Sequence, residues 1–370
     1  MQGHYQNNYF QVVTILPKES ALDILEKALP VNGFNRVLVN ARGTLFKDKW
    51  YQKLKPSLSP EQTIFELLVP GNLVNQVMND ISASGDLDGS GTGVIYSMPC
   101  QQVLFLANQS DNLNYEVPVI EKKIEYKTNV EIIYCIIQKD KAEAVAIAAI
   151  RAGAHGPTVA YGEGKGIREK LGLLRIAISP EKEIVRVVVD DYNSISVFEA
   201  MVKEGKLDTP GMGFIYTMPL SKALVNVASV ATQKNELAHQ YHIIKAIDEL
   251  KGGTAWRTYG TESSNIENKC LQNLVRLSCV INRGFSQPVI DAAMNAGAPG
   301  ATTLSGIEEG RVELPEHGIH INKEVEIIEL TMSPQMVDQV MKAMISEINS
   351  SHSTAYLYTQ HVNKALTYLG

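Results

Sequence analysis

A glycine-rich, cationic segment at residues 162–170 is the strongest candidate for ligand chemistry in this sequence. Its candidate residues are Gly162, Gly164, Lys165, Gly166 and Arg168. Alternating glycines allow successive backbone N–H groups to turn toward an anion, and the cations add positive charge. The segment therefore predicts a site for a small anion or a nucleotide. The alternative is a solvated loop that needs glycine for its bends.

Two further groups could approach a phosphate through their backbone. They are Arg42-Gly43-Thr44 and two Gly-x-Gly pairs, Gly91/Gly93 and Gly211/Gly213. Glycine leaves room for close contact with a ligand, but it also occupies strand starts where φ must be positive. For these pairs the sequence leaves both interpretations open.

The histidines offer no complete metal site. His239/His242 and His317/His320 are each spaced i to i+3, and neither pair has an evident third ligand. We therefore expect solvated or capping histidines. The sequence also has no nucleophile elbow, P-loop, dinucleotide fingerprint or pair of catalytic acids, so we expect a protein that is not an enzyme.

The candidate residues belong to a threefold internal repeat. Gly-Thr-Gly-Val-Ile-Tyr-Ser-Met-Pro at 91–99 returns as Gly-Met-Gly-Phe-Ile-Tyr-Thr-Met-Pro at 211–219, an offset of 120, and a degenerate copy stands at 354–360. A second landmark at 59–69 recurs at 179–189, and its third copy is 324–332. Two landmarks at matching offsets indicate three copies of one unit.

Each copy has the same order of expected elements: strand, helix, strand, strand, helix, strand. The first strands are 9–16, 130–137 and 274–281, the first helices 18–29, 140–152 and 285–296, and the second helices 71–84, 192–204 and 334–348. Long loops at 42–60, 162–180 and 305–323 follow the second strands. This order predicts an α+β chain of three tandem ferredoxin-like domains that close a pseudo-threefold ring.

The expected domains are 9–108, 130–229 and 274–370. They are joined by linkers at 109–129 and 230–273, and the second linker contains a predicted amphipathic helix at 234–250.

The third strand of each copy has one wholly apolar face, as expected if helices cover that face. The other face is mixed and carries a charge at its centre: Glu66, Arg186 and Glu329. If the three sheets face a common axis, these positions converge. A Glu–Arg–Glu network would then be more favourable than three like charges. The alternative is three unrelated, half-exposed charges.

In these features the chain resembles the P-II family of nitrogen regulators. The likeness rests on Gly162–Gly166, which enters a long loop like the family's T-loop, and on the segment 179–191 after it. Gly205-Lys206-Leu207 followed by Gly211–Tyr216 is similar to the family's B-loop and last strand. The resemblance implies a regulator built as a trimer, with nucleotide in clefts between units and T-loops that touch a transporter or an enzyme. Three copies in one chain imply a monomeric pseudo-trimer.

The chain also departs from the family pattern. Val94, Phe214 and Tyr356 stand where the family has a phosphate-binding lysine, and Gly166 replaces a glutamine of the T-loop. In the third copy, Ala355 replaces one B-loop glycine. These departures favour an interaction scaffold without a ligand. A relative that handles a metal or an oxyanion is a third alternative.

Composition limits the remaining classes of function. The chain has 370 residues, 34 basic and 40 acidic, and the net charge of −6 argues against a nucleic-acid partner. No apolar run approaches the roughly 20 residues of a membrane helix, and the N-terminus lacks the features of a signal peptide. We therefore expect a cytoplasmic regulator that senses a small anionic ligand or a nucleotide. Its four cysteines are expected to be inert thiols.

Overall fold

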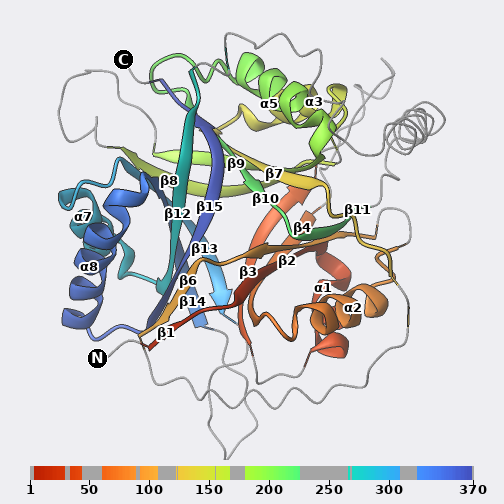
Figure 1. Cartoon of the computed structure of the whole chain (residues 1–370), viewed down its shortest axis with the longest axis horizontal. Coiled ribbons are helices and arrows are strands. Elements are labelled where there is room, and N and C mark those ends of the chain that lie inside the picture. The colour runs from red at the N-terminus through yellow and green to blue at the C-terminus, as the bar shows by residue number, and fades with distance from the viewer. Residues whose placement is uncertain are drawn as a thin grey trace, which may run out of the picture.

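The computed structural model describes residues 4–29, 34–43, 61–88, 92–106, 122, 124–154, 156–166, 180–225, 266, 269–308 and 323–368. The predicted helix at 234–250, both histidine pairs and most of each long loop lie outside these residues. The described part has six helices, and they lie in pairs outside a central set of strands (Figure 1). None of the described helices combines the length and apolar character needed to cross a membrane.

The chain has an α+β fold in which one unit is repeated. Unit 1 consists of β2 (Tyr9–Pro17), α1 (Lys18–Ala28), β3 (Asn35–Gly43), β4 (Glu61–Pro70), α2 (Val74–Ser84) and β5 (Val94–Pro99). Its strands are ordered β3-β4-β2-β5 in the sheet, which is the order of a ferredoxin-like unit.

Units 2 and 3 repeat this order of elements and strands. Unit 2 has β7 (Val130–Gln138), α3 (Ala142–Arg151), β8 (Thr158–Gly166), β9 (Glu181–Asp190), α5 (Asp191–Gly205) and β10 (Gly213–Pro219). Unit 3 has β12 (Leu271–Asn282), α7 (Ser286–Asn295), β13 (Gly300–Glu308), β14 (Lys323–Met332), α8 (Pro334–Ser350) and β15 (Ala355–Leu366). The predicted first strands and helices agree with these bounds to within three residues.

Three short strands were not predicted: β1 (His4–Gln6), β6 (Gln102–Phe105) and β11 (Lys222–Val225). β6 follows unit 1 but pairs with β15 of unit 3, and β11 follows unit 2 but pairs with β5 of unit 1. β1 lies on the outer side of β6. The short extensions therefore join neighbouring units, and segments of four residues carry too little periodicity to reveal this in the sequence.

The described strands close into an antiparallel barrel. The path β15-β10-β7-β9-β8-β3-β13-β14-β12 returns to β15 through paired neighbours, a circuit of nine strands. The second strands β3, β8 and β13 also pair with one another, the end of each lying beside the start of the next. This cyclic pairing is consistent with three ferredoxin-like units forming a ring.

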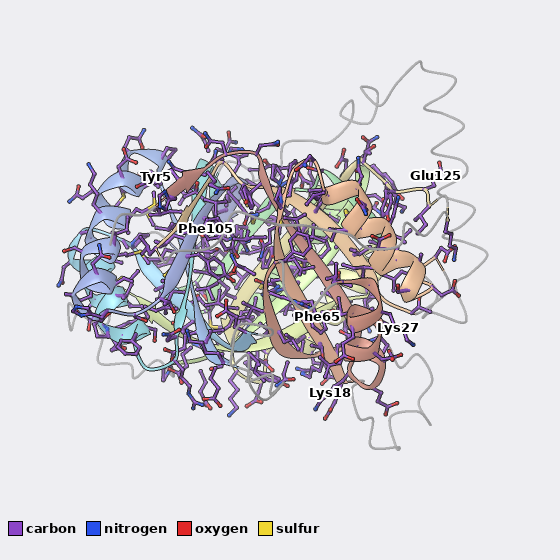
Figure 2. All side chains as sticks on the ribbon, turned by 90° about the horizontal axis from the view of Figure 1, so that it is seen from below. Tyr5, Lys18, Lys27, Phe65, Phe105 and Glu125 are labelled. Atoms are coloured by element: carbon purple, nitrogen blue, oxygen red, sulfur yellow. The ribbon has the colours of Figure 1, made fainter. Side chains whose placement is uncertain are left out.

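The two faces of each sheet belong to different cores. Phe65, Val187 and Leu330 pack in three separate cores with the helices of their own units. Ile64, Ile184 and Ile327 join one core that is common to all three units and fills the barrel. The mixed face of each third strand therefore packs on the other sheets. Figure 2 shows Lys18 and Lys27 at the periphery of unit 1, whereas Phe65 and Phe105 lie among interior side chains.

Candidate functional site

The segment Gly162–Gly166 forms the end of β8 and is part of the sheet. β13 pairs with all five of its residues, and β9 pairs with it as far as Glu163. This extended backbone differs from the curved anion nest that alternating glycines suggested, because most of its N–H groups face neighbouring strands. Arg168 lies outside the described residues.

The close approach of neighbouring strands accounts for glycine at two of these positions. A Cβ atom at Gly162 would lie 2.7 Å from the carbonyl oxygen of Thr303, and one at Gly164 would lie 2.9 Å from the Lys182 side chain. A Cβ atom at Gly166 would meet no heavy atom within 4 Å, so packing does not require glycine there.

Lys165 and Arg42 lie near the ends of second strands in their units, and each reaches the next unit. Lys165 Nζ pairs with Asp291 Oδ1 on α7 at 2.8 Å. Arg42 donates from Nη2 to Glu183 Oε1 at 3.1 Å and from Nε to the Tyr161 hydroxyl at 2.9 Å. Gly43 pairs with Thr158 in the same junction, and Thr44 lies outside the described residues. Both cations therefore act at boundaries between units.

The Gly-x-Gly pairs lie where the last strand of a unit begins. A Cβ atom on Gly213 would lie 2.2 Å from the Ile136 carbonyl oxygen, and one on Gly93 would lie 2.7 Å from the Ile15 carbonyl oxygen. Their φ angles are +154° and +153°, which only glycine adopts readily. These observations give a structural reason for glycine at both positions. Gly91 lies outside the described residues.

The predicted ligand residues of unit 2 gather at one end of its sheet. Gly166 ends β8, and Gly213 begins β10. Two strands, β9 and β7, separate them, so they lie about three strand spacings, roughly 14 Å, apart. Gln138 donates to the carbonyl oxygen of Gly211 at 2.9 Å, and Thr367 of unit 3 donates to that of Gly213 at 3.0 Å. An extended ligand could span this end, which adjoins unit 3.

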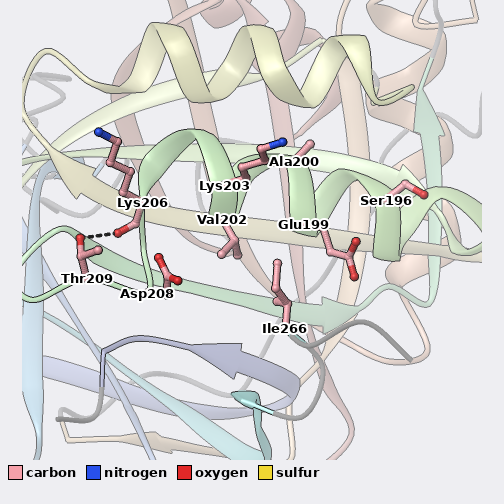
Figure 3. Close-up of a pocket in the computed structure, with 9 residues that line it drawn as sticks. All are labelled: Ser196, Glu199, Ala200, Val202, Lys203, Lys206, Asp208, Thr209 and Ile266. Carbon is pink, nitrogen blue, oxygen red and sulfur yellow. Dashed lines mark hydrogen bonds between the residues drawn. The ribbon is translucent and has the colours of Figure 1, made fainter. Parts of the chain in front are cut away.

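A pocket of about 500 Å³ lies along α5 and the turn that leads toward Gly211. Figure 3 shows Glu199 and Val202 pointing from α5 toward Ile266, which comes from the segment before β12. The lining is completed by Ser196, Ala200, Lys203, Lys206, Asp208 and Thr209. In the sequence, Lys206 stood out only as part of the family resemblance. The pocket itself was missed because Ile266 is distant in sequence from α5.

In unit 1 the chain itself occupies the corresponding groove along α2. The Tyr126 hydroxyl donates to Asn79 Oδ1 at 2.9 Å, and burial raises the pKa of Tyr126, so the hydroxyl stays a donor. Lys122 Nζ pairs with Asp86 at 2.8 Å and with Asp88 at 2.7 Å. The linker before unit 2 therefore closes the groove of unit 1.

The groove of unit 2 keeps one contact of this kind, since Lys269 Nζ lies 4.0 Å from Asp208 Oδ2, but it differs at two other positions. Glu199 stands 120 residues after Asn79, and its buried Oε1 has no hydrogen-bond partner in the described part of the chain. Lys206 replaces Asp86, and the two share a left-handed backbone with φ of 49°. The third member of this set is His352, with φ of 54°. The charge at this one position is therefore reversed between units 1 and 2.

Glu66, Arg186 and Glu329 all lie buried in the barrel, but not as a simple triad. Arg186 Nη1 donates to Glu66 Oε1 at 2.6 Å. Glu329 Oε1 instead accepts from Arg276 Nη1 at 3.2 Å. Gln11 connects the two pairs, since it accepts from Arg276 at 2.8 Å and donates to Glu66 at 3.0 Å. Arg276 was missed, although a single arginine in the apolar strand 274–281 was a signal for it.

The tyrosine of the repeated landmark lies in the same interior in each unit. Tyr96, Tyr216 and Tyr358 are at most 3% exposed. Burial raises the pKa of all three hydroxyls well above the usual value, so they stay protonated. Tyr358 accepts from Gln11 at 3.0 Å. The interior is therefore polar as well as apolar.

Comparisons with known proteins do not assign the chain to a family. No family model matches it, and no curated protein matches it. Among solved structures, aspartate kinase from Synechocystis is similar over 96% of this chain and 44% of its own, at 8% identity and a TM-score of 0.21. The chain thus spans less than half of that protein. Among the described residues, no group of three or more His, Cys, Asp or Glu side chains could hold a metal ion.

Proposed function

We propose that this chain is a P-II-like regulatory protein that binds a small anionic ligand or a nucleotide and signals to a partner protein. Three repeated units that close one barrel support this proposal, because the sequence resemblance implies such a ring for a trimeric regulator. In the proposal one chain supplies the whole ring. Its three units are consequently free to differ.

The observation that carries the proposal is the difference between the grooves of units 1 and 2. In unit 1, Tyr126 packs against α2 and donates to Asn79, and Lys122 pairs with Asp86 and Asp88 at the surface. In the pocket of unit 2, Glu199 is an acceptor at the position of Asn79, and Lys206 is a cation at the position of Asp86. At about 500 Å³ it has the size of a typical small-molecule site.

The lining suggests the chemistry of the ligand. Val202, Ala200 and Ile266 offer an apolar surface for a ring, and Glu199 offers an acceptor for a hydroxyl or amino group. Lys203 and Lys206 have flexible stems that can turn toward a phosphate or carboxylate. A nucleotide combines all three features. The ligand would signal through the end of β8, because Lys165 joins that strand to α7 of unit 3.

Thermal-shift and calorimetric titration of the full chain with nucleotides, cyclic dinucleotides, 2-oxoglutarate and bicarbonate tests this function. We expect one compound to bind, and Lys206→Asn to weaken it at least about tenfold, the effect of losing roughly 1.4 kcal/mol. Asparagine tolerates the left-handed backbone, so the fold should survive. Asp86→Asn, at the equivalent position of unit 1, is the matched control and should bind normally.

The interaction scaffold is the competing function. The closed groove of unit 1 favours it, because there the chain provides its own occupant. Failure of every tested compound to bind the unmodified chain would support the scaffold and contradict the sensor. If Asp86→Asn weakened binding as much as Lys206→Asn does, the site would lie elsewhere.

A further inference from the structure

The barrel contains two buried arginines whose hydrogen bonding differs. Arg276 uses both Nη atoms, on Glu329, Gln11 and Gln360. Arg186 uses only Nη1, which donates to Glu66. Its Nε and Nη2 have no hydrogen-bond partner among the residues the structure describes, although its side chain is only 1% exposed.

The two unpaired donors of Arg186 lie on one edge of the guanidinium. Nε–H and the neighbouring Nη2–H form the parallel fork with which arginine binds anions through two hydrogen bonds. The guanidinium also lies over an aromatic ring, since Cζ is 5.3 Å from the centre of the Tyr134 ring. Buried charged donors are ordinarily paired, so a free fork calls for a partner.

Arg186 lines a small recess between units 1 and 2. Its apolar wall consists of Ile15 and Val94 from unit 1 and Ile132, Val188 and Val225 from unit 2 and its extension. The volume of the recess, about 10 Å³, suffices for about one water molecule or one ion of similar size. The unpaired fork of Arg186 and the recess that this residue lines together indicate one small ligand.

Glu66 balances the charge of Arg186, so the preference for an anion rests on the lining of the recess, which offers donors but few acceptors. Arg186 is the one charged side chain among the described residues that line it. Glu66, its ion-pair partner, is shared with Gln11, which donates to the other carboxylate oxygen. A water molecule would also need acceptors for its own hydrogens. Among side chains the wall offers only the Thr158 hydroxyl, which donates to Gln62 at 2.9 Å.

We propose that this recess binds one halide-sized anion on Nε and Nη2 of Arg186. The ion is structural: it completes the hydrogen bonding of the arginine and stabilises the junction of units 1 and 2. The site is independent of the α5 pocket, so it does not depend on the function proposed above.

Unfolding of the full chain at constant ionic strength tests the site, with sodium chloride or bromide replacing sodium gluconate. Gluconate is too large for the recess. We expect the unfolding temperature to rise saturably, by about 3 °C once the halide is roughly 100-fold above its Kd. Arg186→Lys keeps the charge but loses the fork, and should abolish the rise.

A second variant keeps the test decisive if Arg186→Lys fails to fold. Gly156 lines the recess and Gly166 does not, yet a Cβ atom at either would have no heavy atom within 4 Å. Gly156→Leu should therefore weaken the halide effect, whereas Gly166→Leu should preserve it. The absence of a saturable halide effect in the unmodified chain would overturn the site, as would an equal effect in both leucine variants.

Crystals grown in bromide give an independent outcome. We expect anomalous scattering within hydrogen-bond distance of Arg186 Nε. An ordinary water molecule at that place, without bromide, would show that the fork is hydrated and would overturn the proposal.

Discussion

Arg186 and Glu66 occupy the same position in two repeated units, 120 residues apart, and form an ion pair of 2.6 Å inside the barrel. In a trimer of identical subunits, equivalent positions carry identical residues, so an oppositely charged pair cannot form between them. The single chain removes this restriction. Divergence of its copies allows one unit to supply the counter-charge for another.

Replacing one member of this ion pair should lower the free energy of unfolding more than replacing both. Glu66→Gln leaves the buried Arg186 without its carboxylate partner, and we expect the free energy of unfolding to fall by about 3–5 kcal/mol. Glu66→Leu combined with Arg186→Met should lose less, because no uncompensated charge remains. Urea titration measures both. Glu181→Gln, in the exposed pair with Lys139, is the control and should cost less than about 1 kcal/mol. A double variant as unstable as the single one would contradict the prediction.

Replacement of Glu183 should destabilise the fold more than replacement of Arg42, its partner across the junction of units 1 and 2. Besides pairing with Arg42, Glu183 Oε2 accepts from the N–H groups of Lys141 at 3.1 Å and Ala142 at 2.9 Å, where α3 begins. We expect Arg42→Ala to cost about 1–2 kcal/mol of unfolding free energy and Glu183→Ala about 2–4 kcal/mol.

The equivalent residue of unit 3 isolates the effect of capping. Glu326 accepts from the N–H groups of Gly284 and Ser286 at 2.9 and 3.3 Å, at the start of α7. Its replacement by alanine should remove a cap alone, worth about 1 kcal/mol. Chemical denaturation of the three variants measures the difference, and equal losses for Glu183→Ala and Glu326→Ala would refute a role for the Arg42 pair.

Gly213 should not tolerate a side chain. Its φ of +154° and the 2.2 Å approach to the Ile136 carbonyl oxygen both oppose alanine, so Gly213→Ala should cost at least about 2 kcal/mol. Gly166→Ala meets no neighbouring atom and should change stability by less than about 1 kcal/mol. Thermal unfolding compares them. A harmless Gly213→Ala would show that the glycine serves a ligand and not the packing.

Cys270 should react with thiol reagents before the other three cysteines. Burial raises the pKa of Cys100, Cys135 and Cys279 to about 12, so each stays a protonated, unreactive thiol at pH 8. Cys270 is partly exposed. Iodoacetamide at pH 8 followed by peptide mass spectrometry should find rapid labelling at Cys270 alone. The same reaction in denaturant should label all four cysteines, and rapid labelling of Cys135 in the native protein would contradict the expected burial.

The sequence by itself determined the order of the elements and the repeat. Both depend on local patterns: apolar alternation in strands such as 61–70, helical spacing in 142–151, and two landmarks that recur at one offset. The convergence of Glu66 and Arg186 could also be inferred, because equivalent positions of a closed ring must face one axis. Local periodicity and symmetry need no knowledge of distant partners.

Only the tertiary structure decided which side chains meet across units. Lys165 was expected to face an anion, but in the structure it pairs with Asp291, 126 residues away. Arg276 entered the buried network, and Ile266 became part of the α5 pocket. These contacts depend on how three sheets close around one core, and side chains brought together by that closure leave no shared pattern in the sequence. The physical reason is that a strand's periodicity records which face is buried but not which residue lies opposite it.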